Sequence, residues 1–260
     1  MLSSRTFRQL RIIILLFILL IVVLNTWLSS VQVQSWSRAV QVALYPINAD
    51  GRRDTQQYID ALDIAHFEDI STFLTREAAR YQLNRDAVAE LYLAPVVSSH
   101  PPKISADAGV LSSVVWSLRM RWWSWLNDPW AGPEPDVRIY LRYFSPKNSE
   151  VLEHSLGLQK GMIGLVNGFS SVDYHERNNF VIVHELMHTL GARDKYDLLT
   201  NEPIFPEGYA DPDQEPLLPQ TRAEVMGGRV KVSPGWTLMP LSLDDVIVGE
   251  KTANEIGWIR

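Results

Sequence analysis

Two histidines and a glutamate stand close together in the segment from His184 to Asp194, which reads HELMHTLGARD. His184 and His188 are four residues apart, so on an α-helix both imidazoles lie on one face and can reach one metal ion. Glu185 points roughly 100° further round such a helix, where its carboxylate can act on a water molecule without binding the metal. This layout is typical of a zinc hydrolase.

The residues after the second histidine suggest a third ligand. Gly191 stands where a helix would end in a left-handed residue, which glycine adopts without steric cost. The chain can then turn back and present Asp194 to the metal. Other acidic residues remain open as the third ligand, and a buried helix with a chance histidine pair is the non-metal interpretation. The alternative acidic ligands are Asp197, Glu207 and Glu224.

The sequence around the motif predicts a mostly buried helix. Asp173 and Glu176 have the spacing of a capping box, in which side chains satisfy free backbone N–H groups at the helix start. From Phe180 to Leu190 the residues are apolar except for His184, Glu185, His188 and Thr189. Polar groups in such a helix need partners, which a metal and its water would provide.

The segment from His184 to Asp194 resembles the extended zinc signature of the metzincin metallopeptidases, in the snapalysin-like variant whose third ligand is aspartate. The later segment AEVMGG, residues 223–228, looks like the methionine turn of that group. The resemblance implies a zincin-like α+β fold, in which a mixed twisted sheet packs on an active-site helix. It also implies the roles of individual residues: His184, His188 and Asp194 as zinc ligands, Glu185 as general base, and Met226 as the floor of the site.

The chain departs from that family at two points. Most metzincins have histidine where this chain has Asp194. No tyrosine follows Met226 closely, so Tyr196 and Tyr209 are the candidates for a hydrogen-bond donor to an oxyanion, although each also fits an ordinary core or surface position.

The N-terminus contains an apolar run from Ile12 to Leu24, extended to Leu28, which is about the minimum length for crossing a bilayer. Arginines precede it, so the positive-inside tendency predicts a cytoplasmic N-terminus and a catalytic domain outside the cytoplasm, periplasmic in a bacterium. A cleaved signal peptide is the alternative, but no small-x-small cleavage site follows Leu24. The predicted organisation is a cytoplasmic segment (1–11), a transmembrane anchor (12–28), a stalk (29–37) and one extracytoplasmic catalytic domain (38–260).

Charge and cysteine content narrow the partners. The chain has 24 Lys plus Arg and 30 Asp plus Glu, and without the four arginines before Asp50 the remainder carries a net charge of −10. Such a domain is poorly suited to bind nucleic acid or to lie flat on anionic lipid, so we expect a protein or peptide substrate and a membrane contact only through the N-terminal helix. The absence of cysteine excludes disulfides and a cysteine-based latency device. The oligomeric state is not indicated.

Hydrophobic periodicity predicts the elements that position the motif. Strands are expected over 40–45, 87–97 and 136–144, and an amphipathic helix over Phe67–Tyr81. A further helix over Leu111–Leu126 carries four tryptophans. Its apolar stripe favours core packing, with Trp123 and Trp125 exposed; contact with a membrane surface is the alternative. The stripe comprises Leu111, Val115, Leu118, Trp122 and Leu126.

The segment from Gly157 to Phe169 precedes the motif helix and is interrupted by glycines. It suits an edge strand, and Gly161 and Gly164 would then lie where an extended substrate pairs with the sheet. An ordinary glycine-rich edge or hairpin explains the pattern equally well.

The function expected from these patterns is a membrane-anchored, zinc-dependent metallopeptidase that hydrolyses peptide bonds. Two alternatives stay open: a catalytically silent zinc-binding adaptor, and a zinc amidase acting on a cell-wall amide. Retention of Glu185 argues against the adaptor, because a structural zinc site has no use for a base beside it.

Overall fold

A five-stranded mixed sheet forms the centre of this computed structural model, which describes residues 8–13, 17, 33–103, 109–147, 155–158 and 162–259. The strand order is β2-β1-β3-β5-β4, parallel from β2 to β5 and antiparallel between β5 and β4. The strands are β1 (Val40–Asn48), β2 (Ala89–Leu93), β3 (Val137–Phe144), β4 (Leu156–Leu158) and β5 (Ile163–Phe169). The main helices are α2 (Arg53–Asp60), α3 (Glu68–Arg80), α4 (Val110–Leu126), α5 (His175–Leu190) and α6 (Glu250–Glu255).

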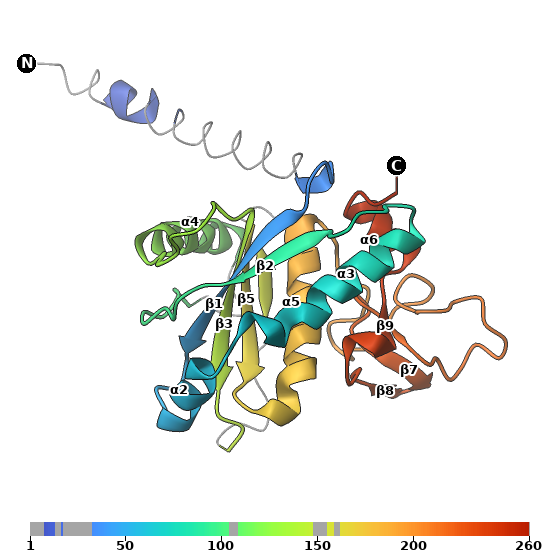
Figure 1. The fold of residues 1–260 in the computed structure, drawn as a ribbon. Helices are drawn as coiled ribbons and strands as arrows, with labels where there is room; N and C mark the ends of the chain where they lie inside the picture. Colours follow the sequence, from blue (N-terminus) through green and yellow to red (C-terminus); the bar gives the residue numbers. More distant parts are fainter. Residues whose placement is uncertain are drawn as a thin grey trace, which may run out of the picture.

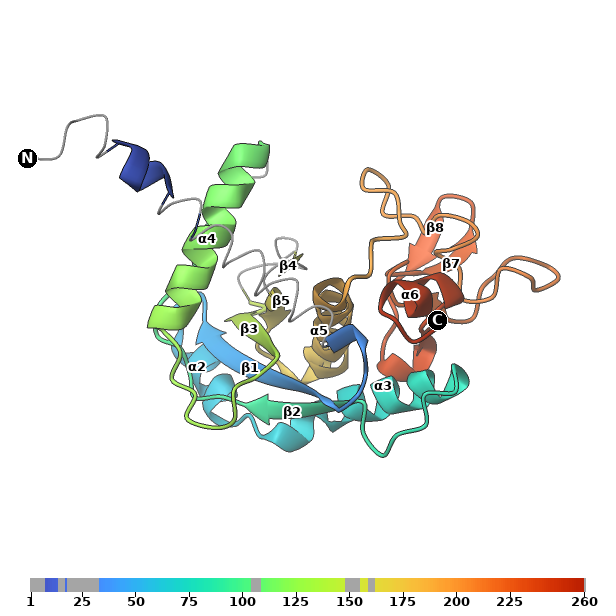
Figure 2. The same cartoon turned by 90° about the horizontal axis from the view of Figure 1, so that it is seen from above.

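Helices cover both faces of the sheet, because alternate side chains of a strand point to opposite faces. On one face Leu44 packs with residues of α3 and α5, such as Phe73, in the larger core. On the other face Tyr45 and Tyr140 pack with Trp116 of α4 in a second core. Figure 2 shows α4 on the opposite side of the sheet from α2 and α3.

The C-terminal part of the chain forms small elements on the far side of α5 from the sheet, as both views show (Figures 1 and 2). A long irregular segment leads from the end of α5 to these elements, as its proline and acidic residues predict. The elements are β6 (Ala223–Glu224), β7 (Val230–Ser233), β8 (Trp236–Leu238), β9 (Val246–Ile247) and α6. Helix α5 is thus enclosed by the sheet and by the C-terminal elements.

Most of the predicted elements are present. The expected strands over 40–45, 87–97 and 136–144 correspond to β1, β2 and β3, and the helix over Phe67–Tyr81 corresponds to α3. The structure is α+β with a mixed sheet, but the fold prediction as a whole is wrong, because it included a membrane-spanning helix that the described residues do not contain. Strand β2 ends at Leu93, earlier than expected, just before Pro95.

The start of α5 differs from the prediction. A 3₁₀ turn (Val172–Tyr174) leads directly into the helix, and neither its own N-cap nor that of α5 makes a side-chain capping hydrogen bond. The expected capping box of Asp173 and Glu176 is therefore wrong. The turn instead provides a backbone partner, because the N–H of His175 donates to the carbonyl of Val172.

The glycine-rich segment is not a single edge strand. Gly164 lies in β5, which pairs with β3 on one side and with β4 on the other, opposite Gly157. Gly164 therefore has no open backbone edge, and β4 forms the edge of the sheet. The side chain of Ile139 explains the glycine, since a Cβ at Gly164 would lie 2.5 Å from its Cδ1 atom. Gly161 lies outside the described residues.

The tryptophan-rich helix packs through a different face from the one expected. Trp116 and Met120 are buried, whereas Leu118 and Trp122 of the predicted stripe are exposed. Trp123, expected outside, packs against the second core, and Trp125 is exposed as predicted. The prediction of core packing for that stripe is wrong, because the sheet receives the opposite face of the helix.

The predicted transmembrane anchor and single-pass placement are also corrected. Among the residues that the structure describes, no helix meets the length and hydropathy needed to cross a membrane. A span needs about 20 apolar residues. The helical stretch described at residues 8–13 is much shorter and contains Arg8 and Arg11, while most of 14–28 lies outside the described residues.

The predicted stalk over 29–37 is partly folded into the domain. Val33 and Trp36 belong to the larger core. The indole Nε1 of Trp36 donates to the carbonyl of Ile256 at 2.8 Å, and the side-chain amide of Gln34 donates to the carbonyl of Leu190 at 2.9 Å. The packed region therefore extends upstream of residue 38 and contacts the C-terminal ends of α5 and α6.

Candidate metal centre

Helix α5 places two histidine rings side by side. The ring centroids of His184 and His188 are 4.8 Å apart, and the ring planes are nearly perpendicular at 87°. Four residues correspond to just over one helical turn, so the spacing alone fixes this proximity. His184 is buried among apolar neighbours and His188 is partly buried.

Gly191 ends the helix and turns the chain back toward the histidines. Its φ of 117° lies in the region that residues with a Cβ rarely adopt. The N–H groups of Gly191 and Ala192 donate to the carbonyls of His188 and Met187, which satisfies the last turn of the helix. This reversal is what the sequence predicts for the glycine, and it leads the chain directly to Asp194.

Asp194 meets both histidines through one carboxylate oxygen. Its Oδ1 atom lies 3.3 Å from Nε2 of His184 and 3.1 Å from Nε2 of His188. One ligand atom from each of the three residues lies within 4.8 Å of the other two, which makes the group able to hold a metal ion. The Asp194 side chain is about one-third exposed at 33%, so the site opens to solvent on this side.

The other ring nitrogens are already engaged. Nδ1 of His184 lies 2.8 Å from the carbonyl of Val225, and Nδ1 of His188 lies 2.9 Å from the carbonyl of Ala192. A carbonyl only accepts, so each Nδ1 donates and each neutral ring presents a lone pair at Nε2. Backbone carbonyls therefore select the tautomer that metal binding through Nε2 requires.

The electrostatics couple the three residues. Burial opposes ionisation of Asp194, but the approach of Nε2 of His184 and His188, which donate to its carboxylate when the rings are protonated, outweighs this and holds the pKa of its carboxyl well below the ordinary value. Burial also lowers the pKa of His184, yet the hydrogen bond to Asp194 and the charge of Glu185 leave that pKa raised overall. The carboxylate of Asp194 is therefore ready to bind a cation.

Glu185 is buried next to the ligands without binding them. Burial raises the pKa of its carboxyl above the ordinary value, against the lowering effect of His184 and His188. Its Oε2 atom is buried and has no hydrogen-bond partner in the part of the chain that the structure describes. Such an unpaired oxygen is costly in a protein interior, and it is accounted for if a water or substrate group occupies the site.

Tyr196 lies beside the same carboxylate. Its ring centroid is 6.2 Å from that of His184, and its phenol is close enough to Asp194 for that carboxylate to affect its pKa. Burial, together with the charges of Asp194 and Glu185, raises the pKa of Tyr196 to about 12. The phenol therefore stays protonated near neutral pH and can donate a hydrogen bond. Tyr209, the other candidate donor, contacts Phe205 and forms a bridge with Ala223.

The turn carrying Met226 supports the site through its backbone. Met226 is fully buried, and its carbonyl accepts from the N–H of Lys195 at 2.9 Å. The preceding Val225 carbonyl holds His184. The carboxylate of Glu224 accepts from the N–H groups of Met226 and Gly227 at 2.7 and 2.8 Å. The turn thus connects His184 with the chain that follows Asp194.

Helix α6 makes hydrogen bonds to the residues around Asp194 and to the turn that carries Met226. The Oε2 atom of Glu255 accepts from the N–H of Arg193 at 3.1 Å and from the buried ammonium of Lys195 at 2.8 Å. Thr252 donates to Glu224 at 2.7 Å. The residues on both sides of Asp194 are therefore held by one carboxylate of α6. Sequence patterns alone do not reveal Glu255, because it lies far along the chain and has no motif.

The alternative third ligands take other roles. Asp197 caps the following turn by accepting from the N–H groups of Leu199 and Thr200, both at 2.9 Å. Glu207 is exposed and lies 3.7 Å from Lys251, and Glu224 is occupied by backbone hydrogen bonds. Within the described part of the chain, only the group with Asp194 has the geometry of a metal site.

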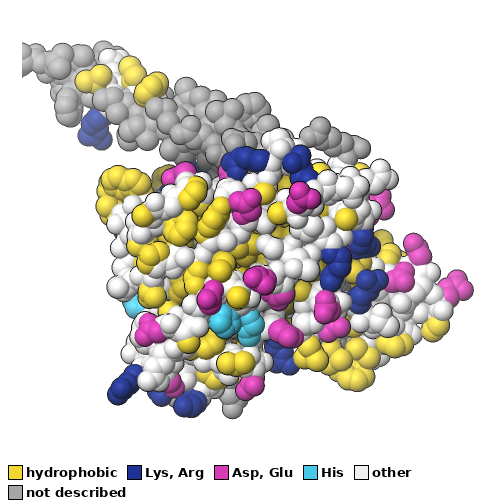
Figure 3. Space-filling model, viewed as in Figure 1, with side chains coloured by type: hydrophobic (Ala, Val, Ile, Leu, Met, Phe, Trp, Pro, Cys, Tyr) yellow, Lys and Arg dark blue, Asp and Glu magenta, His cyan; other side chains and the backbone are white. Residues whose placement is uncertain are grey.

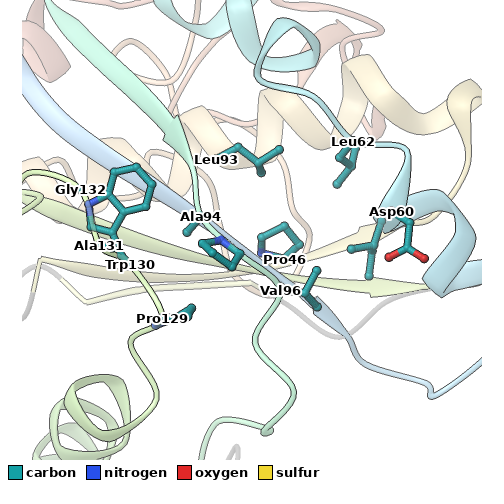
Figure 4. Close-up of a pocket in the computed structure, with 12 residues that line it drawn as sticks. Pro46, Asp60, Leu62, Leu93, Ala94, Val96, Pro129, Trp130, Ala131 and Gly132 are labelled. Carbon is teal, nitrogen blue, oxygen red and sulfur yellow. The ribbon is translucent and has the colours of Figure 1, made fainter.

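A separate pocket of about 500 Å³ lies away from these ligands (Figure 4). Pro46, Leu93 and Trp130 line it, together with Asp60 at its rim. None of the three ligand residues contributes to its wall. The metal group instead lies at the C-terminal end of α5, where the Asp194 side chain is partly exposed.

Comparison with known proteins identifies no family for this chain. No protein-family model matches the chain, and a search of curated proteins returns no match. The case for function therefore rests on the residues and their arrangement.

Proposed function

We propose that the protein is a zinc-dependent metallopeptidase that hydrolyses peptide bonds. One observation carries the proposal: His184, His188 and Asp194 converge beside a buried glutamate oxygen that has no hydrogen-bond partner among the described residues. A structural metal site has no need of such a group, whereas a hydrolase needs a base next to its water. The metzincin resemblance of the same segment supports this function.

Zinc is the metal that suits this donor set. Two neutral imidazole nitrogens and one carboxylate oxygen are ordinary zinc ligands, and three protein ligands leave a position open for chemistry. When bound, zinc would polarise the scissile carbonyl and bring the pKa of water toward neutrality. The roles of this chain's own residues follow from where their atoms lie.

Glu185 would accept the proton of the attacking water and pass it to the leaving amine. Its raised pKa brings the carboxyl closer to neutral pH, which favours both steps. Tyr196 would donate a hydrogen bond to the oxygen that becomes negative during the attack. Met226 would form the floor beneath the ligands, since its turn already holds His184 through Val225.

The first experiment asks whether the purified full-length chain cleaves a broad peptide library in a zinc-dependent way. We expect cleavage that stops on treatment with a chelator and returns when zinc alone is added back. Cleavage that persists after complete zinc removal would contradict the proposal. Hydrolysis of cell-wall amides without any peptide cleavage would favour the amidase alternative instead.

A further inference from the structure

Helix α4 exposes an apolar face that the proposed function does not use. Trp122 and Trp125 are 62% and 69% exposed, and their rings contact each other with centroids 5.2 Å apart. In Figure 3 apolar side chains gather at the edge of the surface where Figure 1 places α4. The exposed apolar residues of the helix are Val114, Val115, Leu118, Trp122, Trp125 and Leu126.

Helical geometry places these side chains together. At about 100° per residue they fall within an arc of roughly 120° on one side of the helix. The opposite side carries Trp116, Met120 and Ser124, which are buried against the sheet. The hydroxyl of Tyr140 donates to Ser124 at 2.8 Å, which fixes the rotation of the helix about its axis. The apolar arc therefore cannot turn inward without breaking this packing.

Positive charge flanks the arc on both sides. By the same geometry, Arg119 lies roughly 20° beyond one edge and Arg121 roughly 20° beyond the other. Arg119 is exposed and Arg121 is half-buried. The sequence of α4 contains no acidic residue. The arc is thus an apolar surface bordered by cations, which complements a layer that is apolar inside and anionic at its surface.

Although the net charge of the domain disfavours flat contact with anionic lipid, α4 itself carries only basic charged residues, and Asp128 beyond its end is paired with Tyr45 and Arg138. In both cartoon views α4 lies at the opposite end from the C-terminal elements (Figures 1 and 2). The irregular segment on that far side carries Glu202, Glu207, Asp211, Asp213 and Glu215. An anionic surface touching α4 would therefore meet the end of the molecule that is far from this acidic segment.

We propose that α4 binds the surface of an anionic lipid bilayer, lying in the interface with its apolar arc among the headgroups. Tryptophan favours this region because its ring is apolar while its N–H is polar. A helix with an apolar arc and flanking arginines binds through buried apolar area and through attraction to anionic lipid. At 17 residues α4 is about 25 Å long, which suits a helix lying in the interface.

The test uses the absence of cysteine from the chain. Leu118→Cys places a single thiol in the arc, and Leu199→Cys places one on an exposed residue of the irregular segment as a matched control. Each full-length variant carries a polarity-sensitive fluorophore and is mixed with vesicles of phosphatidylcholine and phosphatidylserine. Any other lipid contact of the chain is common to both variants.

We expect a blue shift and quenching by brominated lipid chains at position 118 and neither at position 199. Adding Trp122→Ser and Trp125→Ser to Leu118→Cys should abolish the shift. Adding Arg119→Gln instead should raise the vesicle concentration that gives half of the blue shift by about fivefold. Equal responses at positions 118 and 199 would overturn the proposal. A shift at 118 that appears without lipid as the protein concentration rises would also overturn it, in favour of a second copy of the chain.

Discussion

Helices α5 and α4 depart from the usual distribution of side chains in opposite directions. Helix α5 buries His184 and Glu185 in a core, and helix α4 leaves Trp122 and Trp125 exposed to water. A buried polar group needs a partner, and a large exposed apolar patch marks a contact surface. Each helix therefore has a face that intramolecular packing does not complete. We assign a metal and its substrate to α5 and a lipid surface to α4.

Removal of a metal ligand should have the largest effect, which is the loss of zinc binding. His188→Ala and Asp194→Ala should each abolish stoichiometric zinc binding, because a three-ligand site tolerates the loss of one ligand poorly. Glu207→Ala is the matched control, since Glu207 is exposed and only faces Lys251. Metal analysis of the purified variants measures the effect. Full zinc content in Asp194→Ala would show that another group supplies the third ligand.

The two faces of α4 should differ sharply in their contribution to folding. Trp116→Ala removes a buried indole and its hydrogen bond to the carbonyl of Pro102, so it should cost about 3–5 kcal/mol of unfolding free energy. Trp125→Ala should change stability by less than about 0.5 kcal/mol, because Trp125 is mostly exposed. Urea unfolding compares the two variants. Equal losses would mean that the exposed face is covered in the folded protein.

Disturbing the support behind Asp194 should have a smaller effect. Glu255→Gln keeps an acceptor for the N–H of Arg193 but removes the charge opposite the buried ammonium of Lys195. We expect zinc affinity to fall by about tenfold, because losing a group that orients a metal ligand typically lowers metal affinity by at least this much. Chelator competition measures this. An unchanged affinity, together with an unchanged unfolding midpoint, would show that α6 does not position the loop.

The local parts of the metal site could be predicted from the sequence. Helical spacing brings His184 and His188 together, and the left-handed conformation of Gly191 explains how Asp194 returns to them. These features depend on neighbouring residues only. The same is true of β1, β3 and α3, whose periodic patterns gave their positions closely.

Features that depend on distant contacts could not be read from the sequence. The carbonyl of Val225 orients His184 across 41 residues, and Glu255 holds Arg193 across 62. The face of α4 that packs inward depends on Tyr140 of a later strand, so the apolar stripe alone pointed to the wrong side. Gly164 looked like an edge residue, but β4 pairs with its strand.

Glu185→Gln tests whether Glu185 acts as the base of a zinc-dependent hydrolase. The substitution keeps the size and hydrogen-bonding capacity of the side chain but removes its ability to accept a proton. Because Glu185 is not among the three ligands, zinc content should stay unchanged while peptide hydrolysis falls by at least about a hundredfold. Turnover by the variant equal to that of the unmodified chain, with zinc bound in both, would contradict the assignment of Glu185 as the base.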